Sequence, residues 1–363
     1  MYTESCTMII SGPRARFLLS LSFFSFFFFE LESVSVGSDG AVSRQGSVEF
    51  PEADSDNMMK GFAAFENGFT FETASTSCTF DSFFPVSGTV NMKGGTLYLL
   101  KDLIFDSEAS INGMGDIYGN GNLLQFSESI TTLSNSALID NTVMSLDNNI
   151  LWKMATVIQD ECSIDGKNNI MTVEDAGAVT VTTGAQLTLK NLELKGLTGE
   201  NFKCHSDDAS IVFENCKIRL DHDFAFATGS ILFEGETVFT GTNKFIYSSS
   251  RTSTIAAGAK VIFDHGTTFK YNPSVANRDL IYMTNDTSSI CLNGCTLHST
   301  ATGVRLTRGK LILDNLVTLS AEGSNVSESI CFGNGIASGD LTVKVLSDVD
   351  LDVYGEFYYD NVN

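Results

Sequence analysis

The sequence predicts an all-β fold, a single right-handed parallel β-helix (solenoid) with a short N-terminal cap. The first observation is compositional: short Val, Ile, Thr and Phe stretches are interrupted by Gly, Asn, Asp and Ser, and the chain has 31 Gly but only 4 Pro. Such a composition indicates many strands and turns. The second is that whole strand–turn–strand units recur, as in solenoids. The third is that apolar residues alternate within each unit, so that one side of each strand points inward.

Seven copies of the unit can be aligned, each with an alternating strand, a turn residue and a second apolar pair. They are TLYLLKDLIF at 96–105, QLTLKNLEL at 186–194, SIVFENCKIRL at 210–220, SILFEGETVF at 230–239, KVIFDHGTTF at 260–269, SICLNGCTL at 289–297 and KLILDNLVTL at 310–319. From Leu187, the steps between first apolar residues are 24, 20, 30, 29 and 21 residues, to Ile211, Ile231, Val261, Ile290 and Leu311. We expect one coil for each step, with loops of variable length.

Phenylalanines recur at fixed places in these copies. Phe213, Phe233 and Phe263 share one place in the first strand, and Phe239 and Phe269 share one in the second. Stacked coils bring like residues together, so these rings are expected to form an internal aromatic ladder. A β-sandwich also has many short strands, but it should show hairpin turns rather than whole recurring units, so the repeat favours the β-helix.

Residues 1–33 are predicted to be a signal peptide or an N-terminal anchor. Arg14 and Arg16 precede an apolar run at 17–29 that has the length of a signal sequence and is short for a membrane span. Glu30 and Glu32 stand where a cleavage site prefers small residues, so an uncleaved anchor remains an alternative, and a buried segment is the third. The expected location is secreted or at the cell surface or outer membrane.

The rest of the chain divides into two predicted parts. Residues 34–85 are polar and serine-rich at first and are expected to be a linker followed by the N-terminal cap. Within them, DSDNMMKGFAAFE at 54–66 begins with a helix-capping pattern and predicts one short helix. Residues 86–363 are predicted to form the parallel β-helix.

The charge balance restricts the partners. The chain has 22 Lys+Arg and 44 Asp+Glu, a formal net charge of −22, which repels phosphates and anionic lipid surfaces. Nucleic acid is therefore not expected as a partner, and membrane contact is expected only through an uncleaved N-terminal segment. The acidity could attract Ca²⁺, but the chain contains no EF-hand loop and no glycine-rich calcium repeat, so no cofactor is predicted.

The 8 cysteines are widely scattered and are expected to be small core residues. Cys291 and Cys295 have a spacing that could contribute to a metal site, for which His298 is the one nearby further ligand. The alternative is that both cysteines are apolar positions flanking a turn at Asn293 and Gly294. The glycosylation triplets at Asn285 and Asn325 predict exposed loops at most.

Two of the units, GAQLTLKNLELKG at 184–196 and GSILFEGETVFTG at 229–241, resemble those of autotransporter and polymorphic outer-membrane-protein passenger domains, and of pectin-lyase-like β-helices generally. The resemblance covers roughly residues 86–350 and implies a fold more than an activity. The GG-A/L/I and FxxN tetrapeptides of those surface families are poorly represented. The C-terminal LDVYGEFYYDNVN, at 351–363, lacks the strand pattern of a translocator, so the resemblance implies a passenger without one, or a fragment.

Resemblance to pectin-lyase-like enzymes implies carboxylates and a basic residue on neighbouring coils. The best cluster comprises His205, Asp207, Asp208, Arg219, Asp221, His222 and Asp223. Lys217, Arg219, Asp221 and Asp223 are expected to share one face of a strand. DHG at 264–266 is similar to the histidine element of the hydrolases, whereas KIR at 217–219 does not match their basic element.

This cluster has two interpretations: a sugar-binding or lyase-like site, or an ordinary solvated face of a solenoid, which we favour. No catalytic, cofactor-binding or metal-binding residue is assigned, and the chain is more in keeping with a binding protein than with an enzyme. The expected function is an exported, surface-exposed adhesion or structural module that binds host molecules, glycans or itself. The alternative is a pectin-lyase-like polysaccharide lyase or glycoside hydrolase.

Overall fold

The structure is a computed structural model. It describes residues 68–360 apart from 72, 81–83, 175, 274–278, 302, 323–329, 334–339, 347 and 356. Upstream of residue 68 it describes only strands β1 to β7, which lie between residues 15 and 65.

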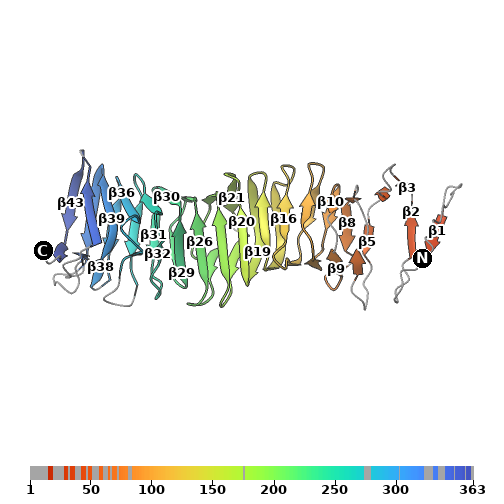
Figure 1. Ribbon diagram of the computed structural model, residues 1–363, viewed down its shortest axis with the longest axis horizontal. Coiled ribbons are helices and arrows are strands. Elements are labelled where there is room, and N and C mark those ends of the chain that lie inside the picture. Colours follow the sequence, from red (N-terminus) through yellow and green to blue (C-terminus); the bar gives the residue numbers. More distant parts are fainter. Residues whose placement is uncertain are drawn as a thin grey trace, which may run out of the picture.

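The chain forms a parallel β-solenoid of about 11 turns, with no helix among its described residues, so the predicted fold class is confirmed. Strands of successive coils lie side by side along the long axis of the molecule (Figure 1). Accordingly, the described residues contain no helix with the length and apolar character needed to cross a bilayer.

One coil shows how the chain builds three faces. β26 (Ser210–Glu214) lies in a 13-stranded sheet, β27 (Lys217–Leu220) in a 16-stranded sheet and β28 (Phe224–Phe226) in a 6-stranded sheet. The next strand, β29 (Ser230–Glu234), pairs in parallel with β26 and begins the next coil. We call these the first, second and third faces.

The first face continues through β16 (Leu123–Phe126), β18 (Val143–Leu146), β20 (Glu161–Asp165), β23 (Gln186–Lys190), β26, β29, β32 (Thr254–Ile255) and β35 (Tyr282–Met283). The second contains β21 (Ile170–Val173), β24 (Glu193–Lys195), β27, β30 (Glu236–Gly241), β33 (Lys260–Phe263), β36 (Ser289–Asn293), β39 (Arg308–Asp314) and β42 (Asp340–Val345). The third contains β28, β31 (Lys244–Tyr247), β34 (Thr268–Tyr271), β37 (Thr296–Ser299), β40 (Leu316–Ala321) and β43 (Asp350–Tyr354).

Two long strands replace a corner in the middle of the molecule. β17 (Thr132–Asp140) and β19 (Ile150–Gln159) pair in parallel along their length. The start of β19 also pairs with β21, and its end pairs with β22 (Ala178–Val181). Each long strand therefore supplies two faces, which separate in the coils that follow.

Inward side chains of successive coils stack into a continuous core. Along the third face, Phe226, Tyr247 and Tyr271 are stacked with centroid distances of 5.7 and 5.9 Å. The predicted Phe213 and Phe233 pair is stacked at 6.0 Å. These contacts confirm an internal aromatic ladder, to which offset stacking of rings adds stability beyond area burial. The predicted match of Phe239 with Phe269 is wrong, because Phe269 lies on the third face opposite Phe245.

The predicted alignment of the copies is wrong between Ile231 and Val261. β33, which carries Phe263, lies on the second face and pairs with β30, where Phe263 is opposite Phe239. The first-face neighbour of Phe233 is Ile255. The step of 30 residues from Ile231 to Val261 therefore spans one full coil and then the turn from the first face to the second face. All faces read as an alternating strand followed by a turn residue. The first-face strand of this coil, β32, has only two residues, so the sequence pattern matches the second-face strand β33 instead.

The helix predicted within 54–66 is also not found. β6 (Asn57–Met59) pairs in parallel with β9 (Ser77–Phe80), and β7 (Ala64–Phe65) with β10 (Phe84–Val86). The other residues of this range lie outside the described part. Pairing with the next coil satisfies backbone groups that a short capped helix would satisfy internally, and tertiary context overrides weak propensity.

Within 1–33, the structure describes β1 (Ala15–Leu18) and β2 (Phe28–Leu31), which pair antiparallel. The remaining residues of this predicted signal segment lie outside the described part, and its role stays a prediction.

Candidate functional site

The corner between the first and second faces is built from single residues in the left-handed region. Asn191 has φ 48°, Asn215 has φ 53° and Gly235 has φ 58°. Asparagine adopts this conformation more readily than most residues, and glycine does so without strain. At Gly235 a side chain is also sterically excluded, because Asn215 Oδ1 lies 2.0 Å from where a Cβ would be. The Asn215 side chain consequently lies against the corner of the next coil, whereas that of Asn191 bonds to Asp165 of the preceding coil.

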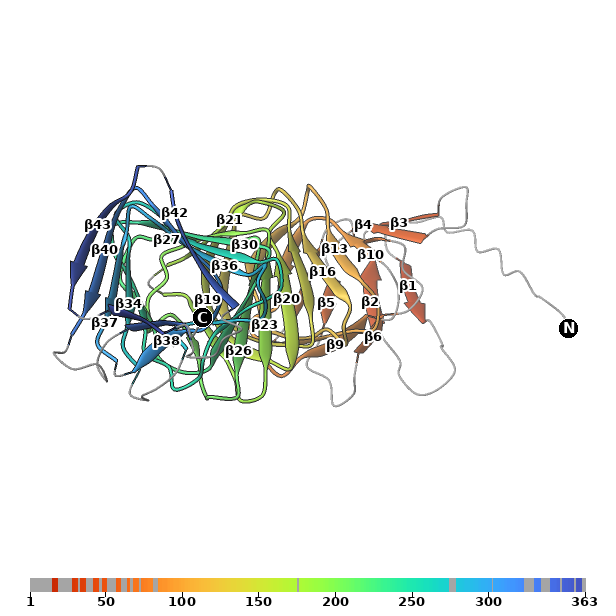
Figure 2. The ribbon, with the colours of Figure 1, turned by 60° about the vertical axis from the view of Figure 1, so that its left-hand side comes forward.

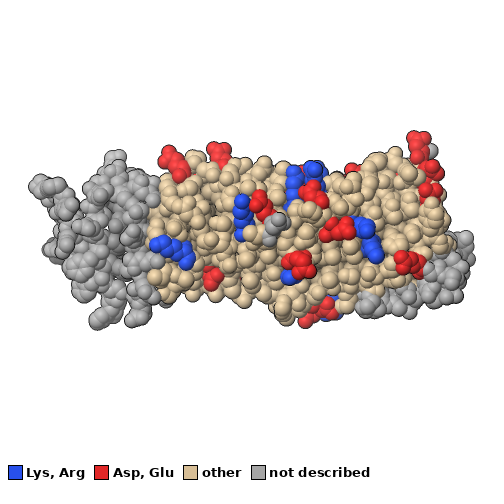
Figure 3. All heavy atoms as spheres, turned by 180° about the vertical axis from the view of Figure 1, so that it is seen from behind, with Lys and Arg blue, Asp and Glu red and all other residues tan. Residues whose placement is uncertain are grey.

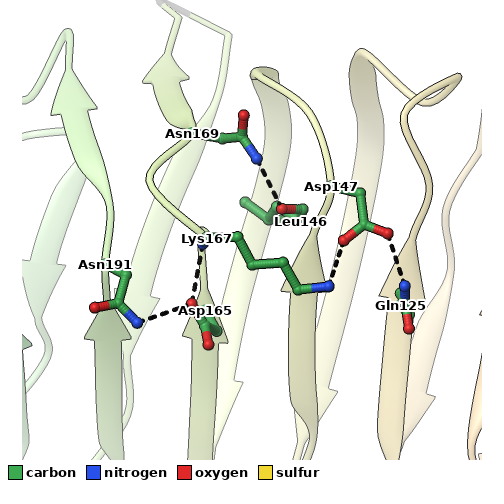
Figure 4. A network of polar contacts seen from close by, with 7 residues as sticks. All are labelled: Gln125, Leu146, Asp147, Asp165, Lys167, Asn169 and Asn191. Atoms are coloured by element: carbon green, nitrogen blue, oxygen red, sulfur yellow. Dashed lines mark hydrogen bonds and ion pairs between the residues drawn. The ribbon is translucent and has the colours of Figure 1, made fainter.

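A polar network joins four successive coils at this corner (Figure 4). Asp147 accepts hydrogen bonds from Gln125 Nε2 at 2.7 Å and Lys167 Nζ at 2.5 Å. Asp165 Oδ1 accepts one from Asn191 Nδ2 at 3.2 Å and one from the Lys167 backbone N–H at 3.0 Å. Partial burial favours the neutral form of Asp147, but the bonds from Lys167 and Gln125 outweigh it, so its pKa is lowered.

A shallow groove of about 390 Å³ continues this corner toward the C-terminus. Its lining is made of corner residues and of the first residues of second-face strands. The lining residues are Asn168, Leu192, Glu193, Asn215, Cys216, Lys217, Glu236 and Val238. Because they come from successive coils, the groove runs across the strands.

Charges of opposite sign alternate along the groove. Glu193 forms ion pairs with Lys195 at 3.4 Å and with Lys217 at 3.3 Å, and Glu236 lies 3.7 Å from Lys260. Asn215 Oδ1 accepts the backbone N–H of Glu236 at 3.1 Å. Exposed ion pairs of this kind contribute about 0–1 kcal/mol each. A ligand can therefore replace them at little cost, with carboxylates accepting and ammonium and amide groups donating hydrogen bonds.

The floor of the groove is apolar and unreactive. Cys216 is buried, and its thiol donates to the Leu189 carbonyl at 3.2 Å. Burial raises the pKa of this thiol to about 12, so it remains protonated at neutral pH. The side chain of Leu192 is equally buried beside it. The polar edges of the groove are thus the groups available to a ligand.

No family model, curated protein or solved structure matches the chain. The strand pairing establishes the solenoid fold, but a fold alone does not define an activity. The groove is therefore the feature that bears on function.

The predicted acidic cluster does not converge into one site. Asp207 and Asp208 lie in the loop between β25 (Phe202–Cys204) and β26, where Arg251 Nη2 donates to Asp208 at 2.8 Å. Ser250 Oγ donates to Asp207. Neither of these partners was part of the predicted cluster. His205, in the same loop, is exposed.

The remaining members of the cluster lie at a different corner, between the second and third faces. Arg219 Nε donates to Asp221 at 2.9 Å, and Asp223 accepts the Lys244 backbone N–H at 3.0 Å. Lys217 and Arg219 share the outward side of β27, as predicted, but the strand ends at Leu220. The aspartates and the exposed His222 follow in the turn, so the expected four-residue strand face is wrong in its second half.

The cysteine pair and His298 lie on different faces. Cys291 is on β36 of the second face, and Cys295 is buried at the corner after it. His298 points outward from β37 on the third face, with Nδ1 3.1 Å from Ser320 Oγ and Nε2 3.1 Å from Glu322 Oε1. Burial raises the pKa of Cys295 to about 12. In the described ranges no group of three or more His, Cys, Asp or Glu side chains is arranged to hold a metal ion.

Two other predicted features can be placed in part. In the DHG element, His265 Nδ1 lies 3.0 Å from Asp264 Oδ1 on the exposed surface. Asn285 Oδ1 accepts backbone N–H groups of the same turn, whereas Asn325 lies outside the described residues.

Sequence reasoning missed the groove, although a signal was present. A corner residue followed within two positions by a charged residue recurs as NLE at 191–193, NCK at 215–217 and GE at 235–236. The repeat pattern alone predicts these residues only as turns. Reading the charges down the stacked copies would have located the groove.

Proposed function

We propose that this chain is an exported, surface-exposed solenoid that binds glycans along the corner groove without cleaving them. The observation that carries the proposal is the groove of alternating carboxylate, amide and ammonium groups across successive coils. Binding to a host surface protein and binding to other copies of the chain are the other recognition modes in keeping with a solenoid surface. The passenger-domain resemblance of the repeats agrees with such a role.

The spacing of the groove suits an extended, hydroxyl-bearing polymer. Hydrogen-bonded strands lie about 4.8 Å apart, so the register partners Glu193 and Lys217 present polar groups at that interval along the solenoid axis. Donors and acceptors held on stacked strands are preorganised, which lowers the entropy lost on binding. Acidic and basic side chains also lie in small mixed groups on the surface seen in Figure 3. Balanced charge at the groove favours a neutral polysaccharide over a highly charged one.

The groove can be tested by removing its two carboxylates. We expect Glu193→Gln together with Glu236→Gln to weaken polysaccharide binding about tenfold or more, because charged hydrogen-bond acceptors are lost. Calorimetry of the full chain against a panel of neutral and acidic polysaccharides measures this. Glu161→Gln, at an exposed first-face position, is the matched control. Unchanged binding by the double variant would refute the groove as the site.

The same samples test the lyase or hydrolase alternative. Hydrolysis of a polysaccharide needs paired carboxylates, and cleavage by elimination needs a base that abstracts a proton. Glu193 and Glu236 are the groove carboxylates that could supply either. Reducing-end and unsaturated-product assays should detect no release with the wild-type chain. Release that disappears in the double variant would replace the binding proposal with the enzymatic one.

Export forms a separate part of the proposal. It is supported by the apolar run at 17–29 behind Arg14 and Arg16. A reporter fused to residues 1–33 should be exported, and N-terminal sequencing would distinguish a cleaved signal from an anchor. Retention of the reporter inside the cell would contradict this part.

A further inference from the structure

The C-terminal coil of the described part of the chain presents an apolar strand edge. Among the described strands, β42 stands at the end of its sheet and pairs only with β39, and β43 stands at the end of its sheet and pairs only with β40. In Figure 2 this end of the solenoid is turned toward the viewer, with β42 and β43 outermost. Edge strands of this kind carry backbone groups that can pair with another chain.

Side chains that are buried in inner coils are exposed here. Val317 and Leu319 of β40 are 0% and 3% exposed, whereas Leu351 and Val353, their register partners on β43, are 41% and 48% exposed. On β42, Val343 and Val345 are likewise exposed. A further strand laid along this edge would cover them, as each coil covers the one before it.

The backbone direction of β43 can be assigned. The Asp350 N–H donates to the Asn315 carbonyl at 3.2 Å, on the side of β40. Successive N–H groups of a strand point to opposite sides, so those of Leu351 and Val353 point to the free edge. These two amides are where an added strand would bond.

The charges on β43 determine which kind of strand can pair with this edge. Asp350 and Asp352 alternate with the apolar residues and form no ion pair with any described residue. A second copy adding its own β43 here would place aspartates close to aspartates, and like charges across strands are destabilising. The net charge of −22 opposes that pairing further. Lysine or arginine at alternate positions would instead pair with the aspartates.

We propose that the β43 edge binds, by strand addition, an extended partner segment in which basic residues alternate with apolar ones. The backbone of the segment bonds to Leu351 and Val353, its apolar side chains cover the exposed core and its basic side chains face Asp350 and Asp352. This site is separate from the corner groove, so either can fail without the other.

The test uses a short fluorescent peptide that alternates lysine with valine, titrated into the full chain. We expect saturable binding, weakened roughly tenfold by Asp350→Asn with Asp352→Asn and unchanged by Asp286→Asn, an exposed control. A peptide alternating glutamate with valine should bind far more weakly. Hydrogen exchange should slow at the Leu351 and Val353 amides on binding. Circular dichroism checks that the variants fold.

Four results would overturn the proposal. Equal affinity for the glutamate peptide would show that charge does not select the partner. Unchanged peptide affinity of the double variant would show that Asp350 and Asp352 do not contribute to binding. Protection at amides other than Leu351 and Val353 would place the peptide elsewhere. Self-association in sedimentation experiments without peptide binding would assign the edge to a second copy instead.

Discussion

At the scale of single residues, the corner beside the groove is held by polar side chains that each serve two coils. Asp147 receives bonds from Gln125 of the preceding coil and Lys167 of the following one. Asn215 sets a left-handed corner and accepts the N–H of Glu236. Such residues fix the register of one coil on the next, which is why the groove has a defined shape.

The lowered pKa of Asp147 predicts a pH-dependent stability. Because its folded-state pKa lies below the unfolded value of about 3.9, the carboxylate contributes stability that is present above that pH and lost as pH falls through the folded pKa. Asp147→Asn should therefore lower the free energy of unfolding at neutral pH, with a difference that shrinks in acid. Urea unfolding at several pH values between about 2 and 7 measures this difference in the free energy of unfolding.

Asp286→Asn serves as the control for that series, since Asp286 is exposed. A deficit in Asp147→Asn that stays constant down to the lowest pH would contradict the assignment of the ionised carboxylate to the network.

At the scale of elements, strands were predictable, and so were their faces except at one step. Alternation identified β23, β26, β29 and β33 as strands because inward and outward side chains differ in polarity. The copies at Leu187, Ile211 and Ile231 share one face, and those at Val261, Ile290 and Leu311 share another. Alternation did not show that β33 belongs to the second face, because the first-face strand of that coil, β32, has only two residues.

Phe263 tests the corrected stacking. Its ring lies 4.8 Å from Phe239 and 4.5 Å from Phe269, and it is fully buried. Phe263→Ala should lower the free energy of unfolding by about 3–5 kcal/mol, and Phe263→Leu by clearly less. Chemical denaturation gives both values. Equally small decreases in the free energy of unfolding for the two variants would contradict the position of the Phe263 ring at the centre of the ladder.

At the scale of the whole molecule, stacking brings together residues that are distant in sequence. Arg251 contacts Asp208, which lies 43 residues earlier in the sequence. No local motif predicts this pairing. The predicted cluster of Asp207 and Asp221 failed for the same reason, because residues close in sequence lie at different corners of one coil. The solenoid class was predictable from repetition, whereas the groove required the coil-to-coil register.

Engineered cysteines can verify that register in solution. Ser210 and Ser230 are paired on neighbouring strands of the first face, at a Cα spacing that suits a disulfide. Ser210→Cys with Ser230→Cys should oxidise to a disulfide, whereas Ser210→Cys with Lys260→Cys should not. The native cysteines of the described residues are buried and should not compete. Reversed outcomes in mass spectrometry would contradict the stacking.

The proposed function depends on polysaccharide binding along the corner between the first and second faces. Hydrogen exchange of the full chain, measured with and without a bound polysaccharide, locates the binding site. We expect slowed exchange at this corner in successive coils, around Asn168, Leu192, Asn215 and Glu236. Protection confined to another corner or face would contradict it.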